Sequence, residues 1–154
     1  ILELIKQLKE LEKTLIHLKY TYDVEPVIKL HIYSEGGDAF MGLSIYDFIK
    51  TLKVPVYTYI DGLIASAATF LFLGGQKRFM TENSAILIHQ ISTGFFGKFE
   101  DLKDEYKNTT ELMKIAKKIY IDNTNMSKKV IDDIIKRELY INHNDALKYG
   151  ILIN

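Results

Sequence analysis

The chain has 154 residues, and its 20 Lys and Arg are balanced by 20 Asp and Glu, so its formal charge at neutral pH is zero. That balance argues against a nucleic-acid binder or a protein of anionic membrane surfaces, which usually carry a basic excess. The length and the 47% apolar content predict one domain, residues 1–154, with one hydrophobic core. Cysteine is absent from the sequence, which excludes disulfides, thiolate nucleophiles and cysteine-ligated zinc and fits a reducing, cytoplasmic setting.

Neither end of the chain carries a targeting signal that can be recognised. The longest uncharged apolar stretch, Leu63–Gly75, is too short for a membrane helix of about 20 residues and predicts a buried segment. The first residues are charged throughout and lack the features of a signal peptide. Because the chain starts without a methionine, we expect a natural N-terminal segment to precede it.

The first half of the chain predicts alternating helices and strands. Leucines three and four residues apart indicate a helix that ends before Pro26. A strand is predicted over 27–33 and is followed by a glycine turn, after which Asp38 is the expected N-cap of a helix that ends near Leu52. A second strand over 54–60 precedes a buried helix over 63–73, and two strand-like pieces follow at 78–81 and 85–89. This order favours parallel βαβ units in an α/β fold.

The second half is predicted to be mostly helical. Residues 98–123 form a charged, periodic segment that is long for a helix in so small a domain, so we expect it to project or to pack on another subunit. Ser127 is the expected N-cap of a shorter helix through about 136, and residues 139–141 are expected to be extended. Asn142 and Asp145 fit a capping box that opens a last helix, which stops at Gly150.

Ser66 is the first candidate for chemistry. It follows a strand and a glycine turn near the expected start of the buried helix, where free N–H groups favour a developing negative charge. The small residues on both sides leave its hydroxyl accessible, and the N–H of Ala67 is placed to donate to an oxyanion. By itself this string also fits a small residue that only eases helix packing.

His89 and the glycines Gly36 and Gly37 are the other candidates. His89 closes an apolar strand, at the kind of edge where sheet proteins expose functional groups, and there it can take a proton from Ser66. A buried structural histidine is the alternative, and it is favoured for His17, His31 and His143. The two glycines join a strand to a helix without a phosphate-loop spacing, which fits a plain turn or a backbone edge that offers N–H groups.

Three stretches in this order resemble the ClpP family of serine proteases: IYSEGGD at 32–38, GLIASAA at 62–68 and KRFMTENSAILIHQ at 77–90. The similarity continues weakly to DALKYG at 145–150. The resemblance implies a ClpP/crotonase-type α/β fold of repeated βαβ units, with a projecting strand-helix handle over about 93–123. It also implies no metal and no cofactor.

Residue roles follow from the same resemblance. Ser66 falls on the nucleophile of the family and His89 on its general base, while Gly36 and Ala67 fall on the two N–H donors of the oxyanion hole. Glu138 occupies the place where the family usually has the aspartate of the triad, and Asp133 is a weaker substitute. A peptide substrate would lie as an added strand between Gly37 and the Gln90–Ile91 segment.

Two departures from the family pattern bear on activity. Glutamate at 138 shifts the triad carboxylate by one methylene, although it can orient a histidine. Glu35 stands where the family usually has proline, and its negative charge beside the oxyanion hole could weaken the hole or repel acidic substrates.

The resemblance also implies an assembly. The family forms heptameric rings, commonly stacked in pairs of fourteen subunits around a chamber, and a ring ATPase unfoldase feeds unfolded chains into it. We therefore expect a homo-oligomer, or a mixed ring with a second ClpP-like subunit, that cleaves extended peptides through an acyl-enzyme. The alternatives are a non-catalytic ring subunit of the same fold, a phage capsid maturation protease and a crotonase-type acyl-thioester enzyme.

Overall fold

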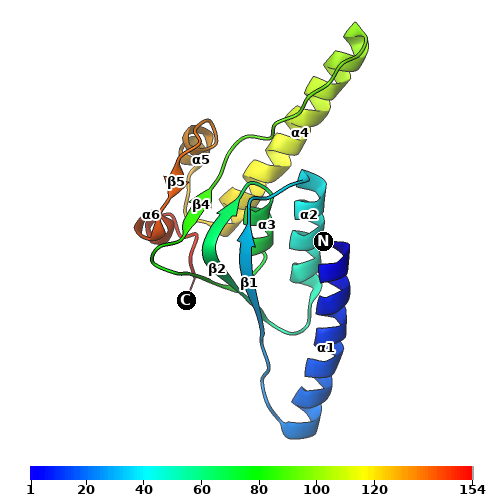
Figure 1. The fold of residues 1–154 in the computed structure, drawn as a ribbon, viewed down its shortest axis with the longest axis vertical. Helices are drawn as coiled ribbons and strands as arrows, with labels where there is room; N and C mark the ends of the chain where they lie inside the picture. The colour runs from blue at the N-terminus through cyan, green and yellow to red at the C-terminus, as the bar shows by residue number, and fades with distance from the viewer. Residues whose placement is uncertain (154) are drawn as a thin grey trace.

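Six helices and five strands alternate along residues 1–153, the part of the chain that the computed structural model describes (Figure 1). In chain order they are α1 Leu2–Tyr22, β1 Ile28–Ser34, α2 Ala39–Thr51, β2 Val56–Ala65, α3 Ala68–Leu73, β3 Lys77–Met80, β4 Ala85–Leu87, α4 Phe99–Asn123, α5 Lys128–Ile134, β5 Tyr140–Ile141 and α6 His143–Lys148.

The sheet is built around β2, which pairs in parallel with β1, β3 and β4. The first part of β2, 57–60, lies beside β3, and its last part, 63–65, lies beside β4. Only β5 runs antiparallel, against β4. The predicted parallel βαβ organisation is therefore confirmed, and the carboxyl ends of β2 and β4 lie at one edge.

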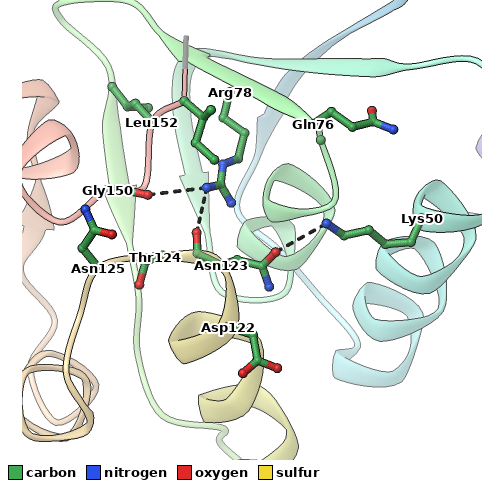
Figure 2. A pocket seen from close by; sticks show the side chains of 11 residues that line it. Lys50, Gln76, Arg78, Asp122, Asn123, Thr124, Asn125, Gly150 and Leu152 are labelled. Carbon is green, nitrogen blue, oxygen red and sulfur yellow. Dashed lines mark hydrogen bonds between the residues drawn. The ribbon is translucent and has the colours of Figure 1, made fainter.

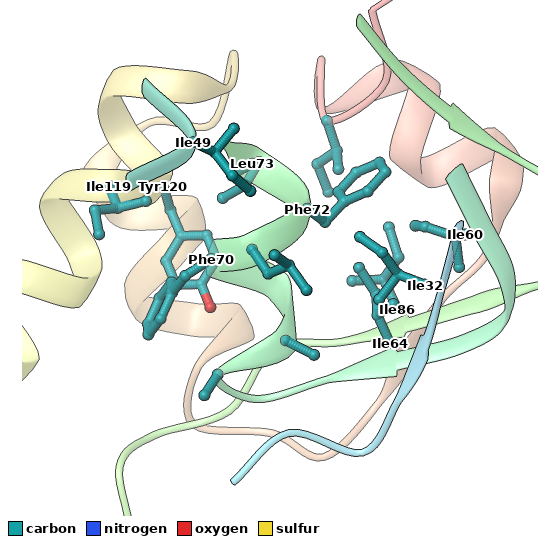
Figure 3. Close-up of a cluster of buried hydrophobic side chains, with 14 of the residues drawn as sticks. Ile32, Ile49, Ile60, Ile64, Phe70, Phe72, Leu73, Ile86, Ile119 and Tyr120 are labelled. Atoms are coloured by element: carbon teal, nitrogen blue, oxygen red, sulfur yellow. The ribbon is translucent and has the colours of Figure 1, made fainter. Parts of the chain in front are cut away.

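One face of the sheet carries the hydrophobic core. Along β1 and the first part of β2 the inward residues are buried and the alternate residues are more exposed, as expected when helices cover one face. All residues of α3 are buried, because this helix lies between the sheet and α4 (Figure 3). The core side chains around it include Ile49, Ile64, Phe72, Ile86 and Tyr120.

The predicted boundary between the second strand and the buried helix is wrong. The strand was expected to end at Ile60 and the helix to begin at Leu63, whereas β2 continues to Ala65 and α3 begins at Ala68. The reason is that 63–65 pair with β4, which satisfies their backbone groups in extended form. A short apolar run bounded by glycine is ambiguous between a buried strand and a buried helix, so the pattern alone does not decide.

The predicted helix starts are confirmed by their caps. Asp38 accepts a hydrogen bond from the Met41 N–H at 2.8 Å, and Ser127 accepts one from the Val130 N–H at 3.3 Å. Asn142 accepts one from the Asp145 N–H at 2.9 Å. Each side-chain oxygen thus satisfies an N–H that the first helical turn leaves open.

The long helix α4 projects from the rest of the chain, with the segment that precedes it running alongside (Figure 1). This arrangement matches the expected handle, although residues 88–98 form no regular strand. None of the helices described within residues 1–153 is long and apolar enough to cross a membrane.

Candidate active site

Ser66 lies in a tight turn between β2 and α3. Its φ angle of 55° is in the left-handed region, which is unfavourable for a residue with a Cβ. Its N–H donates to the Leu87 carbonyl at 2.9 Å, so the turn remains tied to the end of β4. Ser66 therefore stands before the helix, not within its first turn, and such a sharp strand-to-helix turn exposes a side chain above the sheet.

A hydrogen-bonded pair holds this turn from below. The Thr69 N–H and hydroxyl donate to the Ser66 carbonyl at 3.0 and 2.6 Å. The Thr69 hydroxyl also lies 2.6 Å from the Tyr120 hydroxyl of α4, and burial raises the pKa of Tyr120 above its usual range, so the phenol stays protonated. Sequence reasoning missed both residues, since a tyrosine in an apolar helix stripe carries no signal of its own.

Gly36 packs directly against the Ser66 turn. A Cβ on Gly36 would stand 2.6 Å from the Ala65 carbonyl oxygen, 2.7 Å from the Ser66 Cβ and 3.1 Å from the Ala67 nitrogen. Only glycine fits this approach, and its φ of 100° is also one that other residues rarely adopt. The backbone of Gly36 thus lies beside the N–H of Ala67. In this structure the Gly36 N–H donates to the Ser34 hydroxyl at 3.1 Å.

His89 lies two residues beyond β4, on the strand next to Ser66. Because Leu87 pairs with Ala65 in parallel register, His89 and Ser66 both follow the carboxyl ends of neighbouring strands. The imidazole is partly buried, and its Nδ1 lies 2.7 Å from the Gln90 carbonyl oxygen. The structure thus brings the two elements together at one edge of the sheet.

Glu138 lies in the connection between α5 and β5, close in the chain to two residues that flank His89. Three residues before it, the Ile135 carbonyl accepts from the Gln90 N–H at 2.9 Å, and two residues after it, Tyr140 pairs with Leu87. The carboxylate is exposed. Within residues 1–153, no hydrogen bond joins His89 to Ser66 or to Glu138, and Asp133 is exposed on α5.

A groove of about 520 Å³ opens between the start of α2 and the handle. Its walls are Asp38–Phe40, the segment 91–93 and one side of α4 around Glu105–Ile115. Of the three predicted substrate residues, Ile91 lines this groove and Gly37 lines a smaller neighbouring pocket of about 80 Å³, whereas Gln90 is exposed beside them.

The remaining predicted site residues lie apart from a metal-binding arrangement. In the part of the chain that is described, no three His, Asp or Glu residues are placed to hold a metal ion. His31 lies 2.7 Å from Asp61 and stacks on Tyr59 with ring centroids 4.6 Å apart, on the outer face of the sheet. Glu35 is exposed next to Gly36.

Comparison with known families decides the ancestry of this arrangement. Residues 6–154 match the family model described as Clp protease. The chain belongs to the Clp protease family. The resemblance in three sequence stretches is thereby confirmed.

Curated Clp protease relatives match much of the chain. The ATP-dependent Clp protease proteolytic subunit of Deinococcus radiodurans is 33% identical over 130 residues, which are 83% of this chain and 64% of that protein. Proteolytic subunit 2 of Treponema denticola is 31% identical over 97% of this chain and 76% of its own length. The proteolytic subunit of Oenothera elata subsp. hookeri is 33% identical over 79% of this chain. The chain thus spans between half and about three quarters of the length of these relatives.

The fold of a solved Clp protease agrees. The structure titled ClpP1 N165D mutant from Listeria monocytogenes superposes with a TM-score of 0.77 at 26% identity, covering 97% of this chain and 82% of that one. The predicted ClpP-type α/β fold is therefore confirmed.

Proposed function

We propose that the chain is the proteolytic subunit of a Clp-type serine endopeptidase, with Ser66 as nucleophile. The observation that carries this proposal is the Ser66 turn. A serine in the left-handed region, tied to β4 and in contact with Gly36, supports a hydroxyl held at a fixed position beside two backbone N–H groups. Strain of this kind is typical of functional sites, where the surrounding structure keeps it in place.

The proposed chemistry passes through an acyl-enzyme. His89 takes the proton of the Ser66 hydroxyl as Oγ attacks the scissile carbonyl, and the N–H groups of Gly36 and Ala67 bind the oxyanion. His89 then protonates the leaving amine, and a water molecule, activated by the same imidazole, releases the acyl group. Glu138 orients the imidazole in this scheme. The Nδ1 of His89 must leave the Gln90 carbonyl, and the Gly36 N–H must leave the Ser34 hydroxyl, before these roles are filled.

The groove supports an extended peptide as substrate. It runs between the start of α2 and the 91–93 segment, the two stretches expected to flank an added strand near Gly37, Gln90 and Ile91. As in the family, we propose ring assembly with identical or related subunits, a ring ATPase unfoldase as partner, and action in the cytoplasm. Neither a metal nor a cofactor takes part in this scheme.

Labelling with a fluorophosphonate probe tests the nucleophile. The parent is expected to be labelled on Ser66, with the Ser66→Ala variant unlabelled. Two matched variants then test the third member. Glu138→Gln is expected to reduce peptide cleavage by orders of magnitude, up to on the order of 10⁴-fold, because an amide holds the wrong imidazole tautomer. Asp133→Asn is expected to cleave at the parental rate.

A non-catalytic ring subunit is the second candidate. It is favoured by the Nδ1 of His89, which faces a backbone carbonyl while Glu138 is exposed. An assembled, folded protein that is neither labelled nor able to cleave peptides would establish this candidate. Equal rates for Glu138→Gln and the parent would remove Glu138 from the triad but leave the nucleophile in place. The family match favours either candidate over a crotonase-type enzyme.

A further inference from the structure

A second pocket, of about 380 Å³, lies at the opposite end of α4 from its projecting tip (Figures 1 and 2). Four parts of the chain meet there: the end of α2 with Lys50, the start of β3 with Arg78, the end of α4 with Asn123, and the segment that follows α6. None of the proposed catalytic residues lines it. The pocket therefore has no part in the proteolytic chemistry.

Arg78 is the unusual residue of this pocket. Only 1% of its surface is exposed, yet it forms no ion pair within residues 1–153. Both of its hydrogen bonds use one nitrogen, Nη2, which donates to the Asn123 carbonyl at 2.7 Å and to the Gly150 carbonyl at 3.4 Å (Figure 2). Its buried Nε has no hydrogen-bond partner. A buried arginine normally has a carboxylate or phosphate opposite its fork, because an uncompensated buried charge is costly.

Lys50 adds a second cation at the same place. Its Nζ lies 3.4 Å from the Asn123 side-chain oxygen, so Lys50 and Arg78 contact the same residue (Figure 2). Burial lowers the pKa of Arg78 to about 10. Burial, with a further contribution from the charge of Arg78, also lowers the pKa of Lys50. Both directions indicate positive charge that lacks a compensating anion.

The other polar groups of the pocket do not neutralise these cations. Asp122, the acidic residue among the lining residues, is ion-paired with Lys118 one turn earlier on α4. Gln76 accepts a hydrogen bond from the Val56 N–H at 2.5 Å through its side-chain oxygen, which leaves its NH₂ group as a further donor at the rim. The described walls therefore offer two cations and an amide donor.

We propose that this pocket binds a phosphate group, either inorganic phosphate or the phosphate of a small monoester. A dianion matches the two positive charges, and its tetrahedral oxygens can accept from a guanidinium, an ammonium and an amide at once. The bound anion would join the ends of α2 and α4 to β3, so binding stabilises the folded chain by mass action.

Thermal unfolding of the full chain at increasing inorganic phosphate tests the proposal, with sodium chloride holding the ionic strength constant. A rise of about 3 °C is expected at roughly tenfold excess over the dissociation constant. Lys50→Gln should weaken phosphate binding by about tenfold in calorimetric titration. Lys29→Gln, which removes the same charge from an exposed position on β1, should bind as the parent does.

The arms of this experiment separate the sources of the anion. Glycerol phosphate that binds more tightly than inorganic phosphate identifies a monoester site, and the reverse order identifies a free-phosphate site. Acetate that binds as well as phosphate would overturn the preference for a dianion. Equal phosphate affinities for the Lys50→Gln and Lys29→Gln variants would overturn the pocket itself. Arg78→Lys serves as a second variant and should also bind weakly if it folds, since an ammonium cannot replace the guanidinium fork.

Discussion

At the scale of single residues, the candidate site depends on two backbone conformations that ordinary residues avoid. Ser66 takes a left-handed φ although it is not glycine, and Gly36 takes one where a side chain would collide with the Ser66 turn. The neighbouring hydrogen bonds to Leu87 and Thr69 keep the serine in place. The strain is therefore local, and removing it should change stability independently of activity.

Replacing Ser66 separates strain from chemistry. Ser66→Ala and Ser66→Gly should both abolish peptide cleavage, because both lack the hydroxyl. Only glycine relieves the left-handed backbone, so Ser66→Gly should be more stable than Ser66→Ala by about 1 kcal/mol, or roughly 2–4 °C in melting temperature. Calorimetry of the two variants checks this difference. Identical melting temperatures would show that the turn is not strained in solution.

The two glycines of the turn form a natural matched pair. Gly36→Ala would place a methyl group 2.6 Å from the Ala65 carbonyl oxygen, whereas a Cβ on Gly37 meets nothing within 4 Å. Both positions have a positive φ, so both variants lose backbone freedom to a similar degree. We expect Gly36→Ala to unfold at lower denaturant concentration, by roughly 1–3 kcal/mol relative to Gly37→Ala. Similar urea midpoints for the two variants would contradict the close contact.

At the scale of elements, one strand organises the site. β2 exchanges one neighbour for another along its length, from β3 at its start to β4 at its end. This exchange brings β4, and the His89 segment that follows it, beside the Ser66 turn. The Thr69 and Tyr120 hydroxyls then connect the first turn of α3 to α4, the helix that also forms one wall of the groove.

The contact between α4 and α5 includes an ion pair with a defined pH dependence. Lys117 donates to Asp132 at 2.7 Å, and this hydrogen bond lowers the pKa of Asp132 below its ordinary value of 3.8. A lowered folded-state pKa means that folding favours the charged form, so the pair stabilises the protein above pH 3.8 and loses its effect as the pH falls through the folded-state pKa.

Asp132→Asn tests this dependence. The variant should be less stable than the parent at pH 7, and the difference should shrink as the pH falls below about 4. Asp133→Asn on the same helix is the control and should follow the parent at both pH values. Urea unfolding at a series of pH values measures both curves. A stability difference that stays constant from pH 7 to pH 3 would show that the ion pair is not responsible.

At the scale of the whole molecule, the handle carries apolar side chains that the chain itself does not cover. Phe96 is fully exposed, and Phe99, Leu102 and Tyr106 follow it with at least 44% of their surface exposed. An exposed apolar surface of this kind usually marks an interface. Because α4 projects away from the sheet, a second copy of the chain could cover it without reaching the Ser66 turn (Figure 1).

Sedimentation velocity tests this interface. The parent is expected to sediment as a species several times heavier than its 17.8 kDa chain. Leu102→Glu places a charge on the handle and should shift the distribution toward smaller species, because a buried charge without a partner is costly. Tyr20→Glu, at an exposed position on α1, is the control and should sediment as the parent does. A parent that sediments as a single chain would refute assembly through the handle.

Much of the fold followed from local patterns. The leucine stripe of α1, the caps at Asp38, Ser127 and Asn142, and the alternation of strands and helices are properties of neighbouring residues, so they can be read from the sequence. The end of β2 could not be read in this way. Residues 63–65 are apolar in either conformation, and pairing with β4 decides that they are extended.

The same division holds for the functional residues. The sequence by itself determined the family, because Ser66, His89 and Gly36 stand in recognisable strings of residues. Only the tertiary structure decided that Gly36 contacts the Ser66 turn, that Tyr120 lies beneath it, and that Arg78 is buried without an ion pair in the described chain. These features depend on contacts between residues far apart in the chain, and such contacts leave no local pattern. A buried arginine is written in the sequence like any other, and only the fold takes its counterion away.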